Sequence, residues 1–273
     1  MTNDKRSTIA LWIFVGVVLG LPLLYWTIFY VAAQAGVQLS RNIFGVVRCF
    51  GPTVAAVAAL TYIGGRGAWR PLWTSLIQWR VSGRLYAIAL LTPLAVMSLA
   101  LGITYIVQPD VFSLGEINPL KLVAILIILP FLDGPMGEEP GWRGYFLPAL
   151  MQRYSVIVAS LIVGLIWYLW HLPHYHVDGK DMSGDFLFKY LLFIFALSFM
   201  HTWLYKKTGG SVLINVLFHN MTNYVVLLSF TLFPALKGIV LDNTVYFYSM
   251  MALGALAAGS LWMQSRIRGS TTA

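Results

Sequence analysis

The sequence has few charged residues. Only 10% of its 273 residues are charged, whereas 59% are hydrophobic; a soluble domain would carry about 25% charged residues. The apolar segments run unbroken for about 20 residues and do not alternate with period two, which argues against a β-barrel. We therefore predict an integral membrane protein of the all-α class: a polytopic helical bundle that forms a single domain over residues 1–273.

Cysteine is also nearly absent. The single Cys49 excludes an internal disulfide framework and a cysteine-rich metal site. The net charge of +8 is a weak indication of nucleic-acid binding, because an excess of Lys and Arg is the ordinary mark of cytoplasmic loops in membrane proteins. We expect the lipid bilayer to be the main partner and expect no nucleic acid.

Eight hydrophobic segments can be read along the chain. The fourth and fifth are short for a span of about 20 residues, and both flank the pair Glu138 and Glu139. Asp133-Gly134-Pro135 predicts a break there, with a more polar helix continuing through the membrane. The segments are 9–33, 44–63, 85–107, 120–132, 156–170, 186–205, 212–233 and 245–263.

The distribution of basic residues predicts the orientation. Lys and Arg gather before the first segment, in alternate loops and after the last, so both termini are expected in the cytoplasm and the plasma membrane is the expected location. The first apolar run exceeds the 7–15 residues typical of a signal peptide core, which favours an uncleaved first helix. Trp69, Trp73 and Trp79, beside arginines, predict a helix lying on the membrane surface.

Ionisable residues from three segments are expected at similar depth. Glu138 and His171 flank the turn at Arg153, and the helical rise places each about 22–27 Å from it. His219 and Asn223 lie at i and i+4 on the seventh segment, about 18 and 24 Å from Lys207. These four residues are the predicted catalytic set.

The residue types suit hydrolysis. A buried glutamate beside a histidine can act as a general base toward water, and a second histidine with an asparagine can donate hydrogen bonds to an oxyanion. Glu139 and Arg143 are expected to form a supporting i,i+4 ion pair. The other histidines are expected at surface or loop positions; they are His174, His176 and His201.

Three motifs occur in the order Glu138-Glu139-x-x-Trp142-Arg143-Gly144, Trp167-x-x-x-His171 and His219-x-x-x-Asn223. They resemble those of the CPBP family, the CAAX-type and bacteriocin-processing intramembrane glutamic proteases related to Rce1. The resemblance covers about residues 120–225 and implies that Glu138 and His171 activate water while His219 and Asn223 form the oxyanion hole. Trp167 stands where the family usually has Phe.

Other functions stay open at this point. Two histidines and one carboxylate form a common zinc set, but no His-Glu-x-x-His motif is present, and the resemblance implies a mechanism without a cofactor. A non-enzymatic immunity or scaffold protein and a transporter are further alternatives. The leading hypothesis is an endopeptidase acting on a peptide or protein substrate at the membrane, of unspecified identity and with its oligomeric state open.

Overall fold

The computed structural model describes residues 3–39, 49–123, 125, 134–177, 179, 182–236 and 244–270. Within these ranges the chain is helical and contains no β-strand, which confirms the all-α class. The helices are α1 (Asn3–Gln34), α3 (Gly51–Gly64), η1 (Gly65–Trp69), α4 (Arg70–Leu76), α5 (Gly83–Val107), η2 (Pro109–Phe112), α6 (Pro119–Val123), α8 (Pro135–Glu139), η4 (Pro140–Phe146), α9 (Leu147–Met151), α10 (Val156–Val177), α11 (Gly184–Lys207), α12 (Val212–Leu232), η5 (Pro234–Leu236) and α14 (Thr244–Ser270).

Five of the described helices are long and apolar enough to cross a membrane: α1, α5, α10, α11 and α12. The predicted polytopic helical bundle is therefore confirmed. The fifth segment was expected to be short, and that expectation is wrong, because α10 continues to Val177 over 22 residues. Hydropathy falls at His171, but the helix continues since buried polar residues such as His174 can be accommodated inside a bundle. Much of the predicted fourth segment lies outside the described residues.

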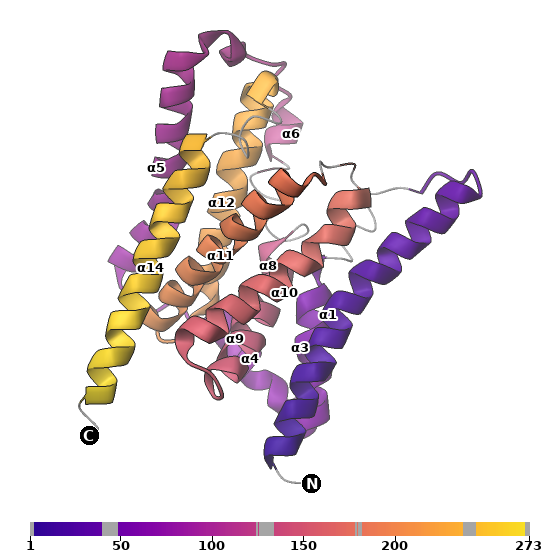
Figure 1. The fold of residues 1–273 in the computed structure, drawn as a ribbon, viewed down its shortest axis with the longest axis vertical. Coiled ribbons are helices and arrows are strands. Elements are labelled where there is room, and N and C mark those ends of the chain that lie inside the picture. The colour runs from indigo at the N-terminus through magenta and orange to yellow at the C-terminus, as the bar shows by residue number, and fades with distance from the viewer. Residues whose placement is uncertain are drawn as a thin grey trace.

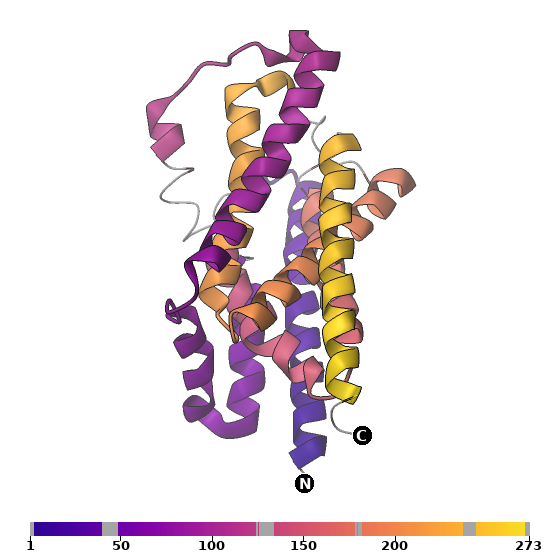
Figure 2. The same ribbon diagram turned by 90° about the vertical axis from the view of Figure 1, so that its left-hand side faces the viewer.

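The two ends of the chain lie at the same end of the bundle. The beginning of α1 and the end of α14 both point to the lower edge in Figures 1 and 2, while α8 lies in the interior among α3, α10 and α12. Arg153, after α9, reaches the beginning of α1, where its Nη2 lies 2.9 Å from Oδ1 of Asp4. The turn at Arg153 is therefore at this same end, and α10 runs from it toward the middle of the molecule.

The predicted break before the glutamates is visible at Gly134. Its φ of 127° is a conformation that side chains with a Cβ rarely adopt, and a new helix begins at Pro135, where proline is well tolerated. Asp133 lies outside the described residues. Beyond Gly134, the helix packs tightly against α3: a Cβ on Gly137 would lie 2.7 Å from the carbonyl oxygen of Cys49, and Thr53 Oγ1 donates to the Gly137 carbonyl at 2.6 Å. Glycine thus allows close approach of the two backbones.

Small polar residues join α10 to α11. Ser198 Oγ donates to the carbonyl of Ser160 at 2.7 Å, and Ser160 Oγ donates to Thr202 Oγ1 at 2.9 Å. Interhelical hydrogen bonds of this kind contribute about 0.6 kcal/mol each in a membrane. They fix the relative position of two helices that each carry histidines of the site.

Candidate active site

The Glu-Glu pair lies in the most enclosed part of the bundle. Glu138 is 5% exposed and Glu139 and Arg143 are 0% exposed. They stand on α8 and η4, and η4 has π-helical hydrogen bonding, a local widening that is frequent at functional sites. Pro140, at the start of η4, cannot donate a backbone hydrogen bond, which accounts for a departure from regular α-helix at this point.

Glu139 and Arg143 form the ion pair predicted from their spacing. Nη1 of Arg143 donates to both carboxylate oxygens of Glu139, at 2.9 and 3.1 Å. Breaking such a buried pair by removing one partner costs about 3–5 kcal/mol, because the other charge is left buried without its partner. The pair therefore keeps Glu139 ionised and links η4, which carries Arg143, to α8, which carries Glu139.

Trp167 on α10 is the side chain around which the three motifs gather. Its Nε1 donates to Oε2 of Glu138 at 3.3 Å, and the guanidinium of Arg143 lies over its ring at 4.7 Å from the centroid. The same ring is in edge contact with His219, with centroids 5.3 Å apart. A phenylalanine, the residue expected from the resemblance, would supply the ring contacts but not the donor to Glu138.

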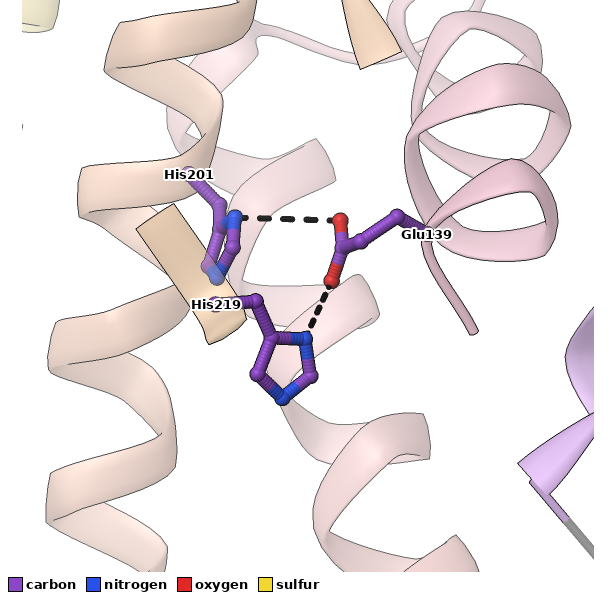
Figure 3. Close-up of side chains that lie close together, drawn as sticks. All are labelled: Glu139, His201 and His219. Carbon is purple, nitrogen blue, oxygen red and sulfur yellow. Dashed lines mark hydrogen bonds and ion pairs between the residues drawn. The ribbon is translucent and has the colours of Figure 1, made fainter. Parts of the chain in front are cut away.

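His219 is hydrogen-bonded to the second glutamate of the pair, Glu139. Its Nδ1 lies 2.8 Å from Oε1 of Glu139, as Figure 3 shows. Because the carboxylate is ionised and accepts hydrogen bonds only, Nδ1 carries the proton and donates it. His219 Nε2 can then donate a hydrogen bond only when the ring is doubly protonated.

His171 and Asn223 form the more accessible side of the site. His171 is half-buried on α10, and its Nδ1 donates to the Trp167 carbonyl at 2.9 Å. Asn223, one turn after His219 on α12, is exposed. Its Nδ2 and Oε1 of Glu138 lie 3.6 and 3.9 Å from the position that a Cβ on Gly134 would take, so the break in the helix leaves room for both groups.

The expected surface or loop positions are wrong for two of the three remaining histidines. His174 is 2% exposed on α10, and His201 is 0% exposed on α11, whereas His176 is exposed as expected. His201 Nδ1 lies 2.8 Å from Asn215 Oδ1 and 3.7 Å from Oε2 of Glu139. The sequence pattern did not distinguish an interior histidine from a lipid-facing or loop histidine, because a histidine in an apolar segment is compatible with all three positions.

The ionisable and polar residues thus form two layers. We call Glu138, His171, His219 and Asn223 the reactive layer, because they are the set predicted from the sequence to be catalytic. Two of them, His171 and Asn223, are half-buried and exposed, respectively. Beneath it lies the supporting layer, whose members are all fully buried: Glu139, Arg143, His201 and Asn215. The contact between Glu139 and His219 joins the two layers.

A metal ion was the alternative expectation, and one group of residues has the necessary atoms. Ligand atoms of Glu139, His201 and His219 all lie within 4.8 Å of one another. The group fits zinc poorly, however. Glu139 already accepts from Arg143 and His219, and a dication would be placed beside a buried guanidinium in a medium of low dielectric. Zinc ligands are normally supported by carboxylates or carbonyls rather than by a cation.

The fold and the two layers define a polytopic helical membrane protein with a buried glutamate–histidine site. Residues 119–225 match the family model described as type II CAAX prenyl endopeptidase Rce1-like. The chain is also 31% identical, over 118 residues, to a protein of Methanococcus maripaludis named CAAX prenyl protease 2. The resemblance of the three motifs to the CPBP, Rce1-like family is thereby confirmed over this part of the chain.

The family model matches the part of the chain that contains the site, and the curated relative matches less than half of the chain. The matched segment is 41% of this chain and 43% of the relative, so the match spans about two fifths of the curated relative. All six of the residues assigned to the reactive chemistry or its support from the sequence lie between 119 and 225.

Proposed function

We propose that this chain is an intramembrane endopeptidase that hydrolyses peptide bonds in membrane-associated peptides or proteins. The observation that carries the proposal is the position of Trp167. Its side chain donates to Glu138 and contacts His219, and its carbonyl accepts from His171. Residues from three separate motifs are thus held around one indole, in a region of the bundle where ionisable groups are costly and usually functional.

In the proposed mechanism, Glu138 is the general base. It takes a proton from a water molecule while the oxygen attacks the carbonyl carbon of the scissile bond, and the same carboxyl group then gives that proton to the leaving nitrogen. His171 helps to orient the water. Since its Nδ1 donates to the Trp167 carbonyl, its Nε2 is the atom that accepts a hydrogen bond from the water when the ring is neutral.

Asn223 and His219 stabilise the oxyanion in this proposal. The Nδ2 of Asn223 is a permanent donor, whereas His219 donates through Nε2 only as an imidazolium. Because Nδ1 is already used to donate to Glu139, Nε2 is the His219 atom that would face the oxyanion in this proposal. Preorganised donors of this kind are worth about 2.7–4 kcal/mol each in acyl-transfer enzymes.

The proposed substrates are peptides or proteins at the membrane. A prenylated peptide ending in a CAAX-type sequence is the first to test, because the relative from Methanococcus maripaludis is named CAAX prenyl protease 2; leader and signalling peptides are the alternatives. We also propose that both termini face the cytoplasm. The beginning of α1 and the end of α14 lie at one end of the bundle, which supports a common side for them.

We propose that no cofactor takes part. The pairing of Glu139 with Arg143 supports this, because this carboxylate, which among the described residues lies close to both His201 and His219, is already paired with a cation. A zinc-dependent peptidase is the second candidate, and the proximity of Glu139, His201 and His219 is the observation that favours it. Activity that is lost with a chelator and restored by zinc would decide for the second candidate.

The direct test uses purified protein in liposomes and a quenched fluorescent peptide with a prenylated CAAX-type C-terminus. Wild-type protein should cleave the peptide, and Glu138→Gln, which keeps the size of the side chain but removes the base, should not. Glu116→Gln is the matched control, because Glu116 is exposed and remote from the three motifs in sequence. Equal cleavage by Glu138→Gln and wild type would overturn the assignment of the base.

A further inference from the structure

His201 is a fully buried histidine that the proposed mechanism does not use. It stands on α11, is 0% exposed, and its ring packs edge-on against Phe218 and Trp167, with centroids 4.9 and 5.7 Å away. Its Nδ1 faces one carboxylate oxygen of Glu139 while His219, whose ring is next to it, faces the other, as Figure 3 shows. A polar side chain at this depth needs hydrogen bonds to offset the cost of burial.

The hydrogen bonds around His201 determine which ring nitrogen carries the proton. Nδ2 of Asn215 donates to the carbonyl of Ser211 at 3.1 Å, and a carbonyl can only accept. The Oδ1 of Asn215 therefore faces His201, 2.8 Å from its Nδ1. Since an amide oxygen cannot donate, Nδ1 of His201 is the donor, and Nε2 carries the lone pair.

The proton on Nδ1 of His201 lies near two oxygen atoms. Besides Asn215 Oδ1, the Oε2 atom of Glu139 lies 3.7 Å from His201 Nδ1. That distance is too long for a strong hydrogen bond, but it places a polarised N–H beside one carboxylate oxygen while His219 binds the other at 2.8 Å. Each histidine ring thus faces a different oxygen of the Glu139 carboxylate, and Arg143 is bound to both oxygens.

We propose that His201 is a positioning residue of this site. The hydrogen bond to Asn215 holds His201, which fixes the rotation of the Glu139 carboxylate that presents Oε1 to His219. The Nδ1–H group of His219 is thereby kept directed at Glu139, which leaves Nε2 as the atom that donates when the ring is an imidazolium. His201 itself does not touch the substrate. Its activity test rests on the proposed function, whereas its spectroscopic test does not.

The first test compares two variants of similar polarity. An asparagine at position 201 can place its amide near the position of Nδ1, whereas a glutamine reaches the position of Nε2 instead. His201→Asn should keep activity within about threefold, and His201→Gln should lower kcat by about tenfold to a hundredfold with KM unchanged, as for the loss of a supporting residue. His176→Gln is the control, because His176 is exposed on α10. Equal activity of the Asn and Gln variants would overturn the proposal.

The second test needs no substrate. The chain has five histidines, so the ring nitrogens of 15N-histidine-labelled protein in nanodiscs can be assigned by nuclear magnetic resonance. We expect the Nδ1–H form for both His201 and His219 in the wild type, and a mixture or the Nε2–H form for His219 in His201→Gln. An Nε2–H form of wild-type His201, or an unchanged His219 in the variant, would contradict the proposal.

The two tests separate the possible outcomes. Absence of cleavage by the wild type, together with the expected ring forms, would reject the proposed peptidase but leave the positioning role of His201 intact. Stoichiometric zinc in the wild type that is lost in His201→Gln would instead make His201 a metal ligand. If His201→Gln does not fold, the ring form of wild-type His201 still decides the central point.

Discussion

Nδ1 of His219 donates to Oε1 of Glu139 at 2.8 Å, which joins the third sequence motif to the first. This hydrogen bond indicates that the two adjacent glutamates have different roles. Glu139 is held by Arg143 and in turn orients His219, while Glu138 accepts from Trp167 beside the half-buried His171. Adjacent residues on a helix point in different directions, so one carboxylate can face the reactive layer while the other faces the supporting layer.

The hydrogen bond from Trp167 to Glu138 can be removed without removing the ring. Trp167→Phe should lower kcat by about tenfold, since a hydrogen bond to a charged group is worth about 1.5 kcal/mol or more, of which part is recovered by water. Steady-state kinetics on the prenylated peptide measures the effect. Trp12→Phe is the control, because Trp12 is 70% exposed on α1; an equal effect of both changes would show that the donor is unimportant.

The Glu139–Arg143 pair should be important for stability. Glu139→Gln leaves the buried guanidinium without its counter-charge, and we expect a loss of about 3–5 kcal/mol in the free energy of unfolding. Replacing both residues by leucine should cost less than the sum of the two single changes, because neither charge is then left alone. Unfolding in detergent with increasing denaturant measures both quantities.

A matched control exists for this ion pair. Lys189 Nζ and Asp185 Oδ2 on α11 lie 2.6 Å apart with the same i,i+4 spacing, but their side chains are 41% and 71% exposed. Asp185→Asn should change stability by about 0–1 kcal/mol, since an exposed pair is well solvated. A loss at Glu139→Gln no larger than at Asp185→Asn would contradict the structural role given to the buried pair.

The third prediction concerns the close contact between α8 and α3. Gly137→Ala should destabilise the protein strongly, because the added methyl group would lie 2.7 Å from the backbone oxygen of Cys49 and one helix must move away. Overpacking of this kind costs about 1–3 kcal/mol. Thermal unfolding compares it with Gly16→Ala on α1, where nothing lies within 4 Å of the added atom and no loss is expected.

Metal dependence gives a fourth prediction. Because Arg143 already binds both oxygens of Glu139, a chelator should leave the rate of cleavage unchanged. The measurement compares initial rates before and after dialysis against the chelator, with elemental analysis of the same sample. A loss of rate that zinc restores would favour the metallopeptidase alternative.

Much of this organisation could be predicted from the sequence. Low charge and long apolar segments predict a helical bundle, and helical rise places Glu138 and His171 at matched depth because both distances are counted from the turn at Arg153. The spacing of Glu139 and Arg143 predicts their ion pair, which the structure confirms. These features depend on local geometry alone.

The supporting layer was harder to predict. His201 and Asn215 come from two helices joined by a short turn at Thr208–Ser211, and the same depth count from Lys207 places them about 9 and 12 Å in. Matched depth could therefore have indicated the pair. It could not show that both side chains face Glu139, since that depends on how α11 and α12 rotate against α8. The direction in which His219 donates likewise depends on tertiary contacts.

The most direct measurement of the central claim is a comparison of membrane peptides from cells that carry the wild-type protein, Glu138→Ala or Glu116→Gln at equal abundance. If Glu138 activates the water, one or more uncleaved precursors should accumulate, and the matching products should disappear, only with Glu138→Ala. Identical peptide populations in all three strains would contradict the proposal that this protein is a peptidase whose base is Glu138.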